Sequence, residues 1–372
     1  MKIAQVAPLW ESIPPHRYGG TERIVSCLTE ELVRLGHDVT LFAAGNSVTS
    51  ATLRAICPSS LRSTPQMFPD ASFSLLLERA FGTYAGHFDL IHSHLDLLGF
   101  PLARRCRTPV LTTVHTRLDL PELIPVFEQF PELPLVSISD AQRCSMPGAN
   151  WQSTIHHGLS QNQYSLHRNL GTYLAFLGRI SPGRGVEQAI ELAKRTEMPI
   201  RIAARVDATD RAYFEHVAQL LEHPLVEYLG EITDEEKNDF LGDAYALIFP
   251  VDRPEPFSLV LIEALACGTP VLAYRRGAVP EIVDHGSTGY LCDTLEEMTH
   301  TVAWVPNLDR RRCREAFEER FTVERMVQDY LLVYQRSVHK ENDRSADQGS
   351  YEVMRQFPPS TTMEDARVVE AA

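Results

Sequence analysis

Short runs of apolar residues alternate along the chain with segments in which apolar residues recur every three or four positions. The first unit has an apolar run over residues 3–7, after which Val25, Leu28 and Leu32 recur at helical spacing until Gly36. The run predicts a buried strand, and the spacing predicts an amphipathic helix that a glycine can end. Strands that alternate with helices predict an α/β fold, in which helices cover both faces of parallel sheets.

The same pattern starts again in the second half of the chain. Residues 173–177 predict a strand, residues 178–185 a loop rich in glycine and arginine, and residues 186–193 a helix. Thr233 and Glu236 have the spacing of a capping box, which predicts a helix start. Two such beginnings predict two doubly wound, Rossmann-like domains that face each other. The remaining predicted strands are 39–44, 88–93, 110–114, 134–138, 154–157, 200–204, 226–229, 246–249 and 271–273.

The limits of the domains follow from this pattern. We expect the first domain to span residues 1–165 and the second to span residues 166–322, with the linker near residues 160–171. Residues 323–339 are again amphipathic. Residues 340–372 are polar and charged, so we expect a disordered tail that contributes nothing to catalysis.

Composition narrows the class of protein. A length of 372 residues suits two domains, and 44% hydrophobic with 23% charged residues is typical of a soluble globular protein. No apolar run is long enough for a membrane span and the N-terminus lacks a signal-peptide pattern, so we expect a cytoplasmic protein. The seven cysteines form no C-x-x-C pair, which predicts reduced thiols. The net charge of -14 argues against a nucleic-acid partner but is compatible with a small basic pocket.

The most informative stretch surrounds a predicted helix start near Ser258. Pro256 places Glu255 in the preceding loop, and Glu263 then lies within a helix that is apolar on nearly all sides. A buried carboxylate needs a partner, and a helix N-terminus suits a phosphate. Glu255 could therefore bind sugar hydroxyls beside a phosphate, while Glu263 could reach a ribose. The alternative is a solvated loop acid and a salt-bridged helix residue.

Two glycine-containing loops are further candidates for ligand contact. Arg179 and Arg184 lie in the loop of the second domain, where glycines allow close backbone approach and guanidinium groups suit phosphate oxygens. Arg205 ends the next predicted strand, near the edge where a doubly wound sheet binds ligands. Gly19 and Gly20 follow Tyr18 at the mouth of the first domain. Ordinary turns with solvated arginines remain the alternative for both loops.

The sequence predicts structural roles for some histidines and a functional role for one. We expect His92 and His94 to lie on different faces of a strand, and therefore not to share a metal. Structural roles are the simpler interpretation for these two and for His156 and His157. His115 follows a predicted strand at its carboxyl end, where a cleft would lie, so we favour a functional role. The chain has no Asp-x-Asp pair where a nucleotide-bound metal would be held, which argues against metal dependence.

Together these features resemble the glycosyl transferases group 1 family, whose members are retaining enzymes of the GT-B fold. The similarity covers roughly residues 1–337. Its most specific part is the E-x7-E motif from Glu255 to Glu263. Further matches are residues 264–271, 279–283, 18–23 and 35–39. The agreement of these motifs with the family's order and structural context makes the resemblance specific.

The resemblance implies that a donor nucleotide binds mainly to the second domain. Glu255 would contact the donor sugar, Glu263 the ribose, and Arg179 and Arg184 the diphosphate. His115 would lie near the transferred sugar. Residues 323–339 would form a helix that crosses back onto the first domain. With Arg205, the further donor-binding residues that we expect are Gly19, Gly20, Phe257, Ser258, Leu259 and Val260.

Three positions depart from the family pattern. Arg184 stands where the family usually has lysine, Ser258 where it has glycine, and His157 where it often has asparagine. Arginine keeps the charge, but its planar fork differs from a lysine point charge. None of these departures removes a charge that the chemistry needs.

We therefore expect a retaining glycosyltransferase that moves a sugar from a nucleotide diphosphate to a glycan, lipid-linked or small-molecule acceptor, without metal or other cofactor. Arg179, Arg184 and the helix near Ser258 would stabilise charge on the leaving diphosphate. The acceptor would contact N-terminal loops at residues 45–73 and 116–134. A nucleotide-sugar 2-epimerase and a non-catalytic nucleotide-sugar-binding protein remain alternatives. The sequence does not indicate the base, the sugar, the acceptor, the oligomeric state or any peripheral membrane contact.

Overall fold

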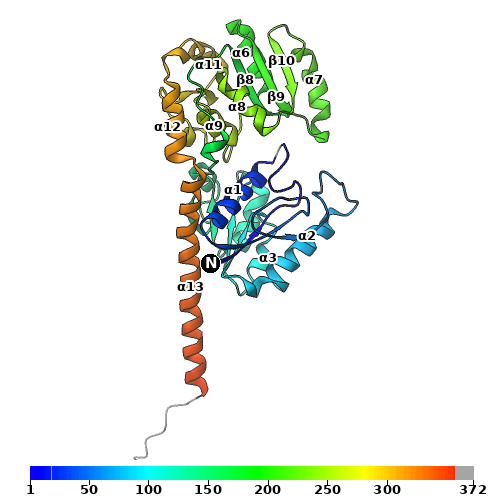
Figure 1. The fold of residues 1–372 in the computed structure, drawn as a ribbon, viewed down its shortest axis with the longest axis vertical. Coiled ribbons are helices and arrows are strands. Elements are labelled where there is room, and N and C mark those ends of the chain that lie inside the picture. Colours follow the sequence, from blue (N-terminus) through cyan, green and yellow to red (C-terminus); the bar gives the residue numbers. More distant parts are fainter. Residues whose placement is uncertain (18, 357–372) are drawn as a thin grey trace, which may run out of the picture.

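The fold is described from a computed structural model that defines residues 1–17 and 19–356 (Figure 1). Tyr18 and the last part of the predicted tail, residues 357–372, lie outside the described residues. Two parallel sheets, each with its own helices, lie one above the other in Figure 1. The predicted α/β fold is therefore confirmed.

The first sheet has seven parallel strands in the order β3-β2-β1-β4-β5-β6-β7. Its strands are β1 (Lys2–Val6), β2 (Asp38–Ala43), β3 (Thr52–Ala55), β4 (Leu90–Ser93), β5 (Val110–Thr113), β6 (Leu135–Ser137) and β7 (Trp151–Thr154). Its α-helices are α1 (Gly20–Arg34), α2 (Pro69–Leu77), α3 (Phe100–Ala103), α4 (Ile124–Gln129) and α5 (Asp140–Cys144). The chain order reverses at β1, which pairs with β2 on one side and β4 on the other.

The second sheet repeats this topology with six strands in the order β10-β9-β8-β11-β12-β13. Its strands are β8 (Tyr173–Arg179), β9 (Ile200–Arg205), β10 (Val226–Gly230), β11 (Ala244–Phe249), β12 (Val271–Tyr274) and β13 (Gly289–Cys292). Its α-helices are α6 (Val186–Thr196), α7 (Arg211–Leu221), α8 (Asp234–Gly242), α9 (Leu259–Ala266), α10 (Val279–Ile282), α11 (Leu295–Val302) and α12 (Arg310–Arg320). Ligands of doubly wound sheets bind at such reversals, beyond the carboxyl ends of the strands.

Helix α13 (Val323–Gln356) follows the second sheet in the sequence but runs down the side of the first (Figure 1). Tyr330 and Tyr334 on this helix are fully buried. The helix continues beyond residue 339, into the segment where we expected disorder, because extending a formed helix costs less than starting one. No helix in the described part of the chain has the length and apolar character required to cross a bilayer.

The prediction of strands worked best for the sheet interiors. The strand expected at 154–157 was placed wrongly, since β7 ends at Thr154, and the sequence pattern also missed β3 and β13. All three are edge strands. The residues of β3 and β7 are mostly half-buried or exposed, so these strands lack the apolar run that marks a central strand. Strand β13 is mostly buried but only four residues long. The capping box at Thr233 and Glu236 is confirmed at the start of α8.

Candidate active site

Two adjoining pockets lie between the carboxyl ends of the two sheets. The inner pocket is lined mainly by the second domain, with Arg17, Gly19, Gly20 and Arg23 contributed by the first. The outer pocket is lined by both domains and includes Trp10, Glu22, Arg62, His115, Arg117, His157 and Arg253. Every predicted site residue lines the inner pocket except His115, which lines the outer one. The structure therefore brings the predicted set into one cleft.

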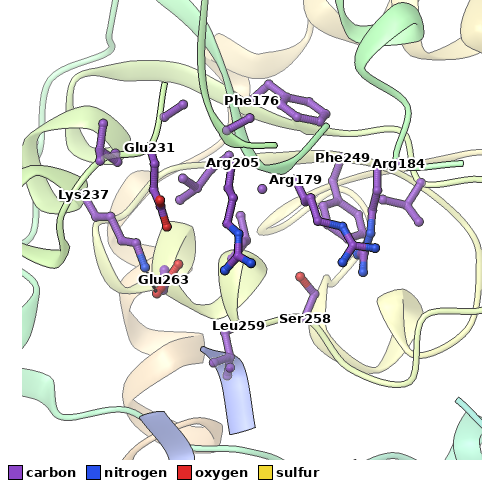
Figure 2. Close-up of a pocket in the computed structure, with 18 of the residues that line it drawn as sticks. Phe176, Arg179, Arg184, Arg205, Glu231, Lys237, Phe249, Ser258, Leu259 and Glu263 are labelled. Carbon is purple, nitrogen blue, oxygen red and sulfur yellow. Dashed lines mark hydrogen bonds and ion pairs between the residues drawn. The ribbon is translucent and has the colours of Figure 1, made fainter. Parts of the chain in front are cut away.

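Helix α9 presents its first turn to the inner pocket. Ser258 is its N-cap residue, and its side chain makes no capping hydrogen bond. The amides of that first turn are therefore available to a ligand, as at other anion-binding helix starts. A Cβ atom on Gly20 would lie 3.8 Å from Leu259 Cδ1, so the start of α1 faces the start of α9 across the cleft. Figure 2 shows three arginine side chains directed toward the same turn.

Arg179 and Arg184 come from the predicted loop of the second domain and Arg205 ends β9, but each arginine is already paired. Arg184 forms an ion pair of 2.9 Å with Glu255, and Arg179 forms one of 3.0 Å with Asp207. Arg205 also pairs with Asp207. The cationic cluster is thus balanced by carboxylates, which an incoming anion would have to displace in part.

The Arg184 loop is held in place by Gly185. This residue has a φ of +83°, and a Cβ atom there would lie 2.2 Å from the carbonyl oxygen of Pro250. A side chain at this position would therefore push the loop away from the neighbouring strand end. The glycine serves close packing at the start of α6, and so places Arg184 beside Glu255.

Glu263 is buried at the base of the inner pocket, with an exposed fraction of 1%. Its Oε1 accepts hydrogen bonds from Tyr164 Oη at 3.0 Å and from Lys237 Nζ at 3.1 Å. Its Oε2 has no hydrogen-bond partner among the described residues. Burial and the nearby Glu263 carboxylate raise the pKa of Tyr164 well above its usual range, so the phenol stays protonated and donates.

Further charges surround this carboxylate. Lys237 also pairs with Asp234 at 3.0 Å, and Asp234 pairs in turn with Arg23 from α1. Two cations and two anions therefore form a nearly neutral cluster that joins the two domains. The sequence pattern predicted that Glu263 needs a dedicated partner, but it did not identify Tyr164, Lys237, Asp234 or Arg23. The closest signal was the capping box of α8, which places Lys237 and Asp234 one turn apart on the same helix.

Glu255 lies where the loop after β11 reaches the cleft. Besides Arg184, it lies 3.7 Å from Arg253, a residue that sequence reasoning missed. The carbonyl oxygen of Glu255 accepts a hydrogen bond of 2.9 Å from the amide of Ala278. The carboxylate is therefore positioned at the junction of the two pockets by both its side chain and its backbone.

His115 lines the outer pocket from the first domain, whereas Glu255 lines it from the second. Its backbone N–H donates to Asp96 Oδ1 at 2.6 Å, and its ring stacks on His157 with centroids 5.3 Å apart. Burial lowers the pKa of His115 to about 3, so the ring is neutral. Its Nε2 lies 3.0 Å from Nδ1 of His94.

The expectation that His92 and His94 lie on different faces of a strand was wrong. Their ring centroids are 4.0 Å apart. Side chains alternate along a strand with a period of two, so residues i and i+2 lie on the same face. Even so, the described residues contain no group of three or more metal-ligating side chains.

Two facing Rossmann-like domains, a cleft between their carboxyl edges and a helix that returns to the first domain define a GT-B protein. Residues 163–320 match the family model of glycosyl transferases group 1, and residues 18–141 match that of Glycosyltransferase Family 4. The resemblance to the glycosyl transferases group 1 family is therefore confirmed over the second domain.

A curated relative is similar over most of the chain, and solved structures share the fold. Phosphatidyl-myo-inositol mannosyltransferase from Propionibacterium freudenreichii is 27% identical over 332 residues, which cover 78% of this chain and 82% of that protein. Sucrose-phosphate synthase from Thermosynechococcus elongatus has a TM-score of 0.75 at 18% identity, covering 90% of this chain and 98% of that one. HepE from Anabaena, in complex with UDP and glucose, has a TM-score of 0.69 at 17% identity, covering 90% and 100%.

Proposed function

We propose that the protein is a retaining, metal-independent glycosyltransferase that binds a nucleotide diphosphate sugar in the inner pocket and its acceptor in the outer pocket. The observation that carries this proposal is the Glu263 carboxylate, buried at the pocket base with one oxygen unpartnered among the described residues. A buried polar atom is costly to leave unpaired, so a ligand hydroxyl is its natural partner. The ribose of the donor would supply that hydroxyl.

The diphosphate would lie between Arg179, Arg184 and the open first turn of α9. These groups are fixed before the reaction, so they stabilise the negative charge that develops on the leaving group without reorganising. Gly20 would let the first domain approach the same phosphates. When the diphosphate attracts Arg184, the carboxylate of Glu255 would be released from that ion pair and accept hydrogen bonds from the donor sugar.

The arrangement around Glu255 supports a retaining mechanism. Two arginines near this carboxylate make it a weak nucleophile, so we propose direct attack by the acceptor hydroxyl on the face that the diphosphate leaves. The bond from the anomeric carbon to the diphosphate breaks as the bond to the acceptor oxygen forms. The proton of the acceptor hydroxyl passes to the departing diphosphate oxygen.

The acceptor side of the proposal rests on the outer pocket. Arg62 belongs to the loop at residues 45–73, and Arg117 belongs to the loop at residues 116–134, the two segments expected to contact the acceptor. Trp10 adds an aromatic surface that is 45% exposed. This combination suits a polar acceptor such as a sugar or polyol, with His115 close to the transferred group.

Thermal stabilisation in EDTA by a panel of nucleotide sugars tests the donor site. We expect one nucleotide family to raise the melting temperature of the wild-type protein but not that of Glu263→Ala. Glu319→Ala is the matched control, since Glu319 is exposed on α12, away from the cleft residues. No shift with any nucleotide sugar would refute the site.

Incubation of the stabilising donor with an acceptor panel in EDTA tests the reaction. Proton NMR of the product should show the anomeric configuration of the donor. An inverted product would refute the mechanism, and a requirement for added metal would refute metal independence. Conversion of the donor without an acceptor would favour the epimerase. Donor binding without turnover across the panel would favour a binding protein.

A further inference from the structure

A continuous chain of buried hydrogen bonds leads from helix α13 to the histidine in the cleft. Tyr334 Oη lies 3.3 Å from Gln5 Nε2, and Gln5 Oε1 lies 2.8 Å from His94 Nε2. His94 Nδ1 then lies 3.0 Å from His115 Nε2. Gln5 and Tyr334 are 0% exposed and His94 is 1% exposed, so water does not compete for these contacts.

The chain continues away from the cleft through His92. Tyr334 Oη lies 2.7 Å from His92 Nδ1, and His92 Nε2 lies 2.7 Å from Thr113 Oγ1. Thr113 Oγ1 lies 2.9 Å from Tyr330 Oη, which is again on α13. Strands β1, β4 and β5 are neighbours in the sheet, so the polar chain crosses three strands and is closed at one end by the helix.

The direction of the hydrogen bonds follows from the orientation of Gln5. Its Oε1 can only accept, so His94 donates through Nε2–H. A neutral imidazole carries one N–H, and therefore His94 Nδ1 must accept from His115 Nε2–H. His115 Nδ1 is then a bare acceptor, and it has no partner among the described residues.

The opposite direction would require a flipped Gln5 amide. His115 would then carry its hydrogen on Nδ1, where it would be an orphaned buried donor. Orphaned buried N–H groups are rarer in proteins than acceptors with unused lone pairs. The direction given above instead ends at Tyr330, whose hydroxyl hydrogen rotates to suit its surroundings. The imidazole rings of His92, His94 and His115 are all neutral, because burial lowers their pKa values.

We propose that Gln5 and His94 are positioning residues that hold His115 in the Nε2–H tautomer, and that Tyr334 of α13 anchors the Gln5 amide by accepting its N–H. The role of His115 in transfer rests on the function proposed above, but its tautomer does not. His115 would thus present Nδ1 as an acceptor for a hydroxyl of the bound sugar. A helix that follows the second domain in the sequence would thus anchor the hydrogen-bond chain that positions a residue in the first.

Nitrogen-15 NMR of the full chain, labelled at histidine, tests the tautomer directly. The His115 signals are identified by their loss in His115→Gln. We expect Nε2 of His115 to be protonated and Nδ1 to be unprotonated in the wild type. His94→Asn should keep this state, because its side-chain oxygen can accept near the position of His94 Nδ1. His94→Leu and Gln5→Leu should give a mixture of tautomers.

Transfer kinetics give the second readout. His94→Leu should lower kcat by about 10- to 100-fold, the usual cost of losing a group that orients a functional histidine, with little change in the donor KM. His94→Asn should recover most of this loss. Donor-induced thermal stabilisation shows whether each variant is folded.

A Nδ1–H tautomer or a mixture in the wild type would overturn the proposal, as would equal kcat values for the folded His94→Leu variant and the wild type. If the tautomer is as expected but no donor is turned over, the proposed function fails while the positioning role stands.

Discussion

Glu22 lies in the first turn of α1 and lines the outer pocket, with an exposed fraction of 7%. Burial raises the pKa of this carboxyl group from 4.5 to about 6, and the neighbouring Glu11 contributes in the same direction. Arg62 and Arg205 offset the shift only in part. The protein therefore holds an ionised carboxylate at neutral pH in a position that disfavours its charge, and we expect Glu22→Gln to stabilise the fold.

The sign and the size of the effect follow from proton linkage. The folded state binds the Glu22 proton more tightly than the unfolded state, so stability falls as pH rises from 4.5 to about 6. A shift of about 1.5 units corresponds to a cost of about 2 kcal/mol that is complete above pH 6. Glutamine has no such cost. The variant should therefore melt about 4–8 °C above the wild type at pH 7.5, and this difference should vanish below pH 4.5.

Differential scanning calorimetry between pH 4 and pH 8 measures this difference. Glu319→Gln is the control, since an exposed carboxylate should show no pH-dependent gain. A gain for Glu22→Gln that is the same at all pH values would mean that packing, not ionisation, is responsible. A variant less stable than the wild type at pH 7.5 would refute the reasoning altogether.

Three further substitutions test other parts of the structure. Tyr164→Phe removes a hydrogen-bond donor to Glu263 and should weaken nucleotide binding about 5- to 10-fold in titration calorimetry, the effect of one lost hydrogen bond. Unchanged affinity would exclude a role of Tyr164 in positioning Glu263 for the nucleotide. Arg184→Lys should lower kcat by less than about tenfold and Arg184→Gln by about 100-fold or more, because charge matters more than the fork; equal losses would contradict this order. Arg310→Met should destabilise the protein by about 3–5 kcal/mol in chemical denaturation. Arg310 is only 5% exposed, and its guanidinium donates to four oxygen atoms of the second domain. A loss below about 1 kcal/mol would show that water takes over the hydrogen bonds of the guanidinium.

Local sequence patterns predicted the parts of the site that depend on near neighbours in the chain. Pro256 and the apolar run after it placed the start of α9 correctly, and with it the spacing of Glu255 and Glu263. The loops containing Arg179 and Gly20 were recognised because a strand, a glycine and a helix follow one another there. Such features depend on backbone geometry over a few residues, and the residue types determine this geometry.

Contacts between distant segments were not predicted. Tyr164 lies 99 residues before Glu263, and Tyr334 lies 329 residues after Gln5, yet both pairs are in hydrogen-bond contact. The ion pair between Arg184 and Glu255 was not predicted either, although both residues were predicted to belong to the site.

The sequence by itself determined the class of fold, the two domains' repeated strand-and-helix pattern and most residues of the cleft, because apolar periodicity, helix caps and glycine positions act locally. Only the tertiary structure decided which charges neutralise one another, which oxygen of Glu263 is left without a protein partner, and how α13 reaches His115 through Gln5 and His94. These outcomes depend on distances of a few ångströms between side chains on different elements, and those distances are set when the sheets, the cleft and the returning helix pack together.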